Sequence, residues 1–154
     1  MGKRTAVATL GLALALLTSG LSSRLHADAG GANRPLTGHA EGVVTGVSPA
    51  GALVVESTGT ATHLGKFTRT EHVFIDGFDI SGTIVFTAAN GDELRATFEG
   101  GFTSPTTAEG TYTFVGGTGR FAHATGTADF AATTAVTPDG VTHVAVTFDG
   151  KISY

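Results

Sequence analysis

The sequence contains no cysteine and so offers no thiol as a nucleophile or metal ligand. The side chains best suited to chemistry are therefore a few charged and aromatic residues. Residues 61–73 alternate in character, so that His63, Phe67 and Arg69 fall on one face of an extended strand. If Phe67 points toward an apolar interior, His63 and Arg69 point there too, and Glu41 from an earlier stretch can join them. A buried charge persists only when it is paired. The set therefore predicts either a satisfied structural network, or a polar anchor or acid–base group for a bound molecule.

Other catalytic and metal-binding patterns are missing. None of the five serines after residue 29 stands in a Gly-x-Ser-x-Gly elbow, which argues against a hydrolase. The five histidines in the same part of the chain include no pair at helical i,i+4 or strand i,i+2 spacing. Only His39 and Glu41, two residues apart, resemble part of a metal site. We therefore expect no metal and no cofactor.

A glycine-rich stretch from residue 115 to residue 126 is the most distinctive part of the chain. Gly117, Gly119 and Ala122 match a G-x-G-x-x-A pattern, but a dinucleotide site needs a helix after it. Residues 123–135 instead alternate as a strand does. We therefore expect a tight glycine loop between adjacent strands, with Phe121 plugging one end of a barrel.

The elements that must position these residues are β-strands. No stretch after Gly30 has apolar residues at helical spacing, whereas period-two alternation recurs, most clearly around residues 94–98, 128–132 and 144–154. Turn residues separate these runs at Ser48-Pro49-Ala50-Gly51, Asp76-Gly77, Asn90-Gly91 and Pro138-Asp139-Gly140. The pattern predicts an all-β domain of about eight antiparallel strands, spaced as in up-and-down barrels and sandwiches.

Composition sets the limits of this domain. The chain has 154 residues with 23 Gly, 10 Phe, 14% charged residues and a net charge of −4, which is room for one domain. A mean hydropathy of +0.20 is too apolar for a disordered chain. The absence of cysteine excludes a disulfide-stapled fold and a thiol nucleophile. Most of the Phe side chains are needed for the core, since each contributes roughly 1.5 to 3 kcal/mol when buried.

The first 29 residues are predicted to be a secretory signal peptide. Lys3 and Arg4 precede an apolar run over residues 6–17, which is shorter than the roughly 20 residues that span a bilayer. The expected domain then spans residues 30–154. We expect the protein to be secreted into the periplasm or the extracellular space and to have no integral membrane anchor. Without the leader, the nine basic and thirteen acidic residues become six and twelve, a net charge of −6. The remaining basic residues form no patch, so we exclude nucleic acid as a partner.

The glycine-rich stretch carries a resemblance to known proteins. Gly116-Gly117-Thr118-Gly119-Arg120-Phe121, followed by Gly126, resembles a segment of dirigent proteins and, more loosely, of allene oxide cyclases. The stretches 62–68 and 87–94 are similar to secreted bacterial proteins of the same kind, which have no established function. The resemblance implies a closed, calycin-like barrel of eight antiparallel strands around an apolar cavity. In the two plant families this cavity directs the ring closure or coupling of a reactive intermediate. The acidic and basic pocket residues of those families have no match here, and only the glycine loop carries over, in an architectural role.

Three functions follow as alternatives. The first is a non-enzymatic secreted barrel that binds a small apolar ligand or serves as a stable extracellular module. The second is a cyclase or isomerase, with His63, Arg69 or Glu41 steering charge, and the third is a structural or adhesive surface protein. The sequence leaves open whether the chain is an enzyme and whether it forms a homo-oligomer. The expected pocket residues are Glu41, His63, Phe67, Arg69, Phe98 and Tyr112.

Overall fold

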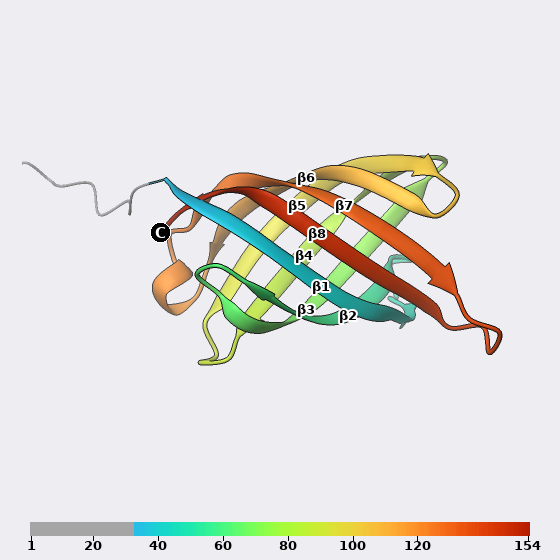
Figure 1. Ribbon diagram of the computed structural model, residues 1–154, viewed down its shortest axis with the longest axis horizontal. Coiled ribbons are helices and arrows are strands. Elements are labelled where there is room, and N and C mark those ends of the chain that lie inside the picture. The colour runs from blue at the N-terminus through green and yellow to red at the C-terminus, as the bar shows by residue number, and fades with distance from the viewer. Residues whose placement is uncertain (1–32) are drawn as a thin grey trace, which may run out of the picture.

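The computed structural model describes residues 33–154, and the predicted signal peptide lies outside them. Eight antiparallel strands form one closed barrel, in which each strand pairs with the next and the last pairs with the first (Figure 1). The prediction of an all-β, eight-stranded closed barrel is confirmed. The strands are β1 (Arg34–Val47), β2 (Leu53–Ala61), β3 (Gly65–Asp76), β4 (Asp79–Ala88), β5 (Glu93–Ser104), β6 (Thr107–Gly117), β7 (Thr125–Val136) and β8 (Thr142–Ser153).

The predicted turns are all present between strands. Gly51, Gly77, Gly91 and Gly140 each have a positive φ, a backbone conformation that glycine adopts without strain. Barrel closure leaves no unpaired strand edge in the part of the chain that the structure describes. The adhesive alternative therefore loses the edge-to-edge pairing on which it rests.

Inside the barrel, Phe rings lie over glycines of the neighbouring strand. This pairing occurs four times, at Gly38–Phe148, Gly59–Phe67, Gly82–Phe98 and Gly110–Phe130. In each case a side chain on the glycine would overlap the ring. Ring-over-glycine packing lets large aromatic side chains fill the narrow interior of an eight-stranded barrel. The high glycine content is thus part of the core.

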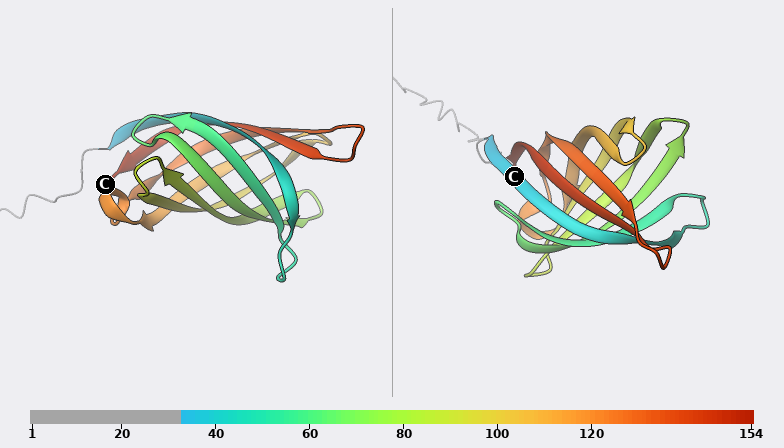
Figure 2. Two further views of the ribbon diagram at one scale, coloured as in Figure 1. Left: turned by 90° about the horizontal axis from the view of Figure 1, so that it is seen from below. Right: turned by 45° about the vertical axis from the view of Figure 1, so that its right-hand side comes forward.

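One end of the barrel is closed. The glycine loop between β6 and β7 forms the short 3-10 helix η1 (Gly119–Phe121), which sits beside the C-terminus (Figure 1). Phe121 is 0% exposed and belongs to the same core cluster as Leu36, Leu94 and Ile152, and its ring centroid lies 5.0 Å from that of Tyr154. Phe121 thus lies buried where the glycine loop covers this end of the barrel. At the opposite end lie the turns after β1, β3, β5 and β7 (Figure 2).

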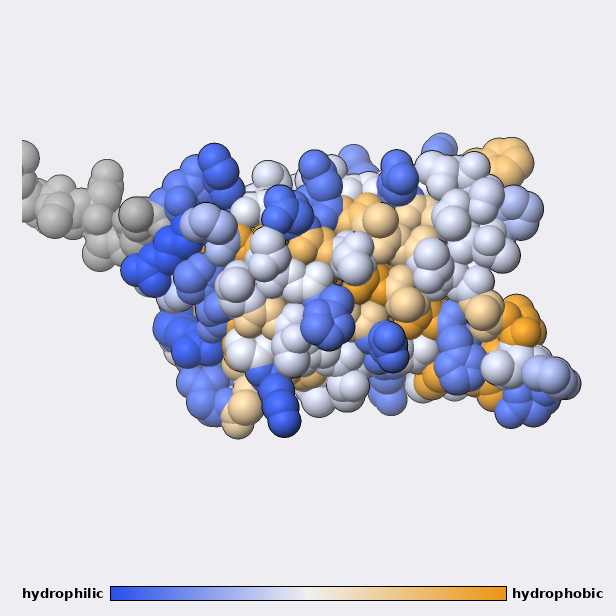
Figure 3. Space-filling model, in the orientation of Figure 1, coloured by the Kyte–Doolittle hydropathy of each residue, from blue (hydrophilic) through white to orange (hydrophobic). Residues whose placement is uncertain are grey.

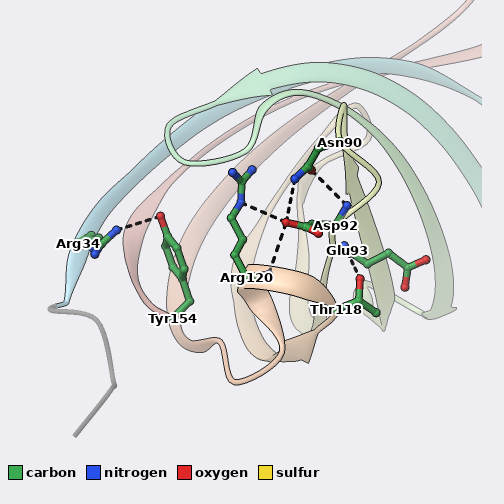
Figure 4. A network of polar contacts seen from close by, with 7 residues as sticks. All are labelled: Arg34, Asn90, Asp92, Glu93, Thr118, Arg120 and Tyr154. Atoms are coloured by element: carbon green, nitrogen blue, oxygen red, sulfur yellow. Dashed lines mark hydrogen bonds and ion pairs between the residues drawn. The ribbon is translucent and has the colours of Figure 1, made fainter. Parts of the chain in front are cut away.

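Polar contacts hold η1 on the closed end. The Asp92 carboxylate lies between the Asn90 amide at 2.9 Å and the Arg120 guanidinium at 3.7 Å (Figure 4). The Glu93 backbone N–H donates to Thr118 Oγ1 at 2.9 Å. The loop that carries the resemblance is therefore tied to the β4–β5 turn, and its role here is structural.

Candidate functional site

The inward-facing side chains of β3 show that the other end of the barrel is open. From the closed end they are Phe67, Arg69, Glu71, Val73 and Ile75. Arg69 is 2% exposed and Glu71 7%, whereas Val73 is half-buried and Ile75 is 48% exposed. Exposure that rises steadily along one face of a strand indicates a depression that deepens toward the middle of the barrel.

A buried ion pair lies at the middle of the barrel. The Arg69 Nη2 group donates to Glu71 Oε2 at 3.1 Å, and the Nη1 group donates to the Tyr112 hydroxyl oxygen of β6 at 3.3 Å. The Tyr112 ring stacks on Phe130 with centroids 4.6 Å apart. Among the described residues, Arg69 Nε and the hydroxyl of Ser57, the residue paired with Arg69 on β2, have no hydrogen-bond partner.

Burial governs the titration of this cluster. Desolvation raises the pKa of the Glu71 carboxyl, although the positive charge of Arg69 acts in the opposite direction. Desolvation likewise raises the pKa of the Tyr112 hydroxyl, so this group keeps its proton. The site therefore holds a permanent cation, a neutral phenol and a carboxyl that loses its proton at a higher pH than a free one and, once ionised, is paired with Arg69.

A cavity of about 220 Å³ extends from this cluster to the open end. Glu71 and Tyr112 line its inner end, at the middle of the barrel, together with the rings of Phe98 and Phe130. Its walls are otherwise apolar apart from two threonines, and they are formed mainly by Val44, Leu53, Val55, Val73, Ile75, Ile80, Phe102, Pro105, Ala108, Ala132, Thr134, Thr142, Val144 and Val146. An apolar pocket with a few convergent polar groups is the usual form of a small-molecule site.

Exposed apolar side chains surround the open end. Phe78, in the β3–β4 turn, is 79% exposed, and Val47, Phe74, Ile75 and Val136 are also exposed. Figure 3 shows hydrophobic residues gathered at the right-hand end of the molecule, where the β7–β8 turn lies. The opening of the cavity is thus apolar, which favours the entry of an apolar molecule.

Four of the six expected pocket residues lie inside the barrel. Phe98 and Tyr112 line the cavity, whereas Phe67 and Arg69 lie on the side of it nearer the closed end. Among these four, only Arg69 and Tyr112 are joined by a hydrogen bond. The alternation of apolar and polar residues was sufficient to place all four on the inner face.

Glu41 and His63 lie elsewhere, and the expected cluster is corrected accordingly. Glu41 is exposed on the outer face of β1, because its neighbour Ala40 takes the inward position. His63 is in the β2–β3 turn, with a φ of 67°, and its Nε2 atom is 3.0 Å from the Pro35 carbonyl oxygen. Its ring meets Tyr154 edge-on at the closed end. The polar partners of Arg69 among the described residues are Glu71 and Tyr112, not Glu41 or His63.

The acidic partner of Arg69 is Glu71, which the sequence reasoning left out of the pocket. A signal was available, because Glu71 lies two residues after Arg69 and so on the same face of the strand. A buried guanidinium needs a carboxylate, and the nearest one on that face is Glu71.

The described residues offer no metal centre. His39 and Glu41 share the outer face of β1, as their spacing predicts, but no group of three His, Asp or Glu side chains in residues 33–154 could hold a metal ion. Within the same range, no helix is sufficiently long and apolar to cross a membrane.

Comparison with models of known protein families gives no match, and comparison with curated proteins gives none either. Among solved structures, the chain is similar to a pterocarpan synthase dirigent protein, with a TM-score of 0.43 and 17% identity. The match covers 79% of this chain and 86% of that chain. The barrel assignment rests on the strand pairing of this structure, and the resemblance to allene oxide cyclases and secreted bacterial barrels stays a prediction.

Proposed function

We propose that this protein is a secreted barrel that binds a small, largely apolar molecule without transforming it. The observation that carries the proposal is the cavity of about 220 Å³, apolar on its walls and open at one end. The predicted signal peptide supports the secreted location. Barrels of eight strands are either filled by side chains or hold one small ligand, and the rise in exposure from Arg69 to Ile75 supports the second case.

The test is to identify what the purified protein retains. The chain without residues 1–29 is incubated with a mixed lipid and terpenoid extract, repurified and analysed by mass spectrometry of its solvent extract. We expect one apolar species in stoichiometric amount. Toluene added to the protein is expected to shift NMR signals of cavity residues. An empty extract together with unshifted signals contradicts the proposal and indicates a purely structural barrel.

A matched pair of variants locates the binding. Ala132→Phe places a ring in the cavity, because Ala132 lines it, whereas Ala131→Phe places the same ring on the exposed outer face of β7. We expect the first variant to lose the ligand and the second to keep it. Equal retention by both variants would place the ligand outside the barrel.

A second candidate function is an isomerase or cyclase. It is favoured by the Glu71 carboxyl, whose raised pKa and position on an apolar cavity suit a group that transfers protons. The extracts of the wild type and of Glu71→Gln distinguish the two functions. A binding protein retains the same compound in both, whereas an enzyme retains product in the wild type and an unconverted isomer in the variant.

A further inference from the structure

The polar end of the cavity presents one unused acceptor and one unused donor. Arg69 does not line the cavity, and both of its Nη groups are engaged, with Glu71 Oε2 and the Tyr112 oxygen. In residues 33–154, Glu71 Oε1 accepts no hydrogen bond and the Tyr112 O–H donates none. Both side chains line the cavity, so a ligand can reach them.

The chemistry of these two groups selects the polar group of the ligand. A carboxylate oxygen accepts a hydrogen bond and a phenol O–H donates one, so their complement is a group that does both. A hydroxyl group meets this requirement. A ketone leaves Glu71 Oε1 without a donor, a hydrocarbon leaves both groups unpaired, and unpaired buried polar groups are unfavourable.

Charge selects a neutral ligand. Arg69 and Glu71 already form a balanced pair with side chains that are 0% and 9% exposed. An ammonium or carboxylate on the ligand would bring an additional charge into an apolar enclosure with no counter-ion, which is strongly disfavoured. The apolar walls carry only Thr134 and Thr142 as further polar residues. A second polar group on the ligand would therefore meet mainly apolar side chains.

The volume sets the size of the ligand. At the packing density of protein interiors, about 0.74, a cavity of 220 Å³ encloses a molecule of about 160 Å³, which corresponds to about ten heavy atoms. An apolar cavity of about 150 Å³ is known to take benzene. A ligand larger than benzene and of up to about ten heavy atoms, such as a single compact ring with short substituents, therefore fits this cavity.

We infer that the ligand is a compact neutral alcohol of about ten heavy atoms, whose hydroxyl group donates to Glu71 and accepts from Tyr112. This inference rests on the proposed function and names its ligand class. The apolar body of the alcohol lies against Phe98 and Phe130 and points toward the open end of the barrel.

Shape-matched probes test this inference. Menthol, menthone and p-menthane share one skeleton and differ in carrying a hydroxyl, a carbonyl or no polar group, and menthylamine adds a charge. Dissociation constants are measured by NMR titration of the chain without residues 1–29. We expect menthol to bind at least about tenfold more tightly than each of the others, the effect of about one hydrogen bond. Equal binding of menthol and menthone, or tighter binding of menthylamine, overturns the inference.

One variant and a matched control test whether Tyr112 causes the preference for menthol. Tyr112→Phe removes the phenol hydroxyl and keeps the ring, so the preference for menthol over p-menthane should fall while p-menthane still binds. Thr113→Val, on the exposed outer face of the same strand, is the control. An unchanged preference in Tyr112→Phe overturns the inference. If p-menthane and toluene bind but menthol is not preferred, the inference alone fails, whereas no binding by any probe removes the proposed function as well.

Discussion

Replacing Arg69 should lower the stability of the barrel by an amount that depends on pH. Arg69→Met leaves Glu71 buried without its cation, and breaking a buried ion pair costs about 3–5 kcal/mol. The unpaired carboxyl can avoid part of this cost by binding a proton, since its pKa is already raised and loses the opposing influence of Arg69. We therefore expect a smaller loss of unfolding free energy at pH 5 than at pH 8, measured by urea denaturation.

A double variant checks that explanation. Replacing Glu71 by Met in the Arg69→Met background removes the unpaired carboxyl, and buried ion pairs can often be replaced by apolar side chains without net loss. We expect the double variant to recover most of the lost stability. An equal loss for Arg69→Met at both pH values, with no recovery in the double variant, would show that the ion pair is not the cause.

Glu71 should give the wild-type barrel a pH dependence of its own. Because its pKa in the folded state is raised above 4.5, the folded state binds more protons than the unfolded state between 4.5 and the raised value. The contribution of Glu71 is thus fully present below pH 4.5 and is lost as the pH rises through that window, by about 1.4 kcal/mol per pH unit. The stability of the wild type relative to Glu71→Gln should therefore fall as the pH rises. Glu109→Gln, on the exposed face of β6, is the control, and a constant difference would contradict the prediction.

How far single residues could be predicted depended on their position within a strand. Phe67 and Arg69 were placed correctly because β3 begins at Gly65 and alternates without interruption. His63 was misplaced because the pattern of alternation continues across the turn in sequence, while the chain reverses there, with positive φ at His63 and Gly65. Hydrophobic periodicity does not record such a reversal. The one local sign of it was Gly65 itself.

At the scale of elements, the glycine beneath each Phe ring should matter as much for the stability of the barrel as the ring itself. A Cβ atom on Gly82 would overlap the His72 carbonyl oxygen and lie 2.8 Å from Phe98 Cζ. We expect Gly82→Ala to lower the unfolding free energy by about 1–3 kcal/mol, as overpacking of a core does. Gly46→Ala is the matched control, because nothing lies within 4 Å of that position and its φ is not positive.

Urea denaturation of the two variants separates packing from backbone effects. Both substitutions make the same change to the unfolded chain, so only the native environment differs. We expect Gly46→Ala to stay within about 0.5 kcal/mol of the wild type. Equal stability of the two variants would mean that β4 can move away from β3 and β5 at Gly82 without loss.

For the whole molecule, the alternation and turn residues predicted about eight strands and the inner faces of β5, β7 and β8, but not the register of the first two strands or which strands close the barrel. Seven of the eight strand pairings join neighbours in sequence, and local patterns suffice for those. The pairing of β1 with β8 joins the two ends of the domain, from Arg34–Ile152 to Val43–His143. Periodicity carries no information on so distant a partner, and the expectation of closure came from the resemblance. The cavity could not be predicted from local patterns, because side chains from strands all around the closed barrel form its walls.

This long-range closure should separate two otherwise similar core residues in folding kinetics. Phe98 covers Gly82 across the β4–β5 hairpin, 16 residues away in sequence, whereas Phe148 covers Gly38 across the β1–β8 closure, 110 residues away. Loop-closure entropy opposes the distant contact more strongly, so local hairpins should form first. We expect Phe98→Leu mainly to slow folding and Phe148→Leu mainly to accelerate unfolding, for a similar loss of stability. Stopped-flow folding and unfolding rates across a range of urea concentrations measure both effects. Slower folding of Phe148→Leu, with an unchanged unfolding rate, would instead place barrel closure within the transition state.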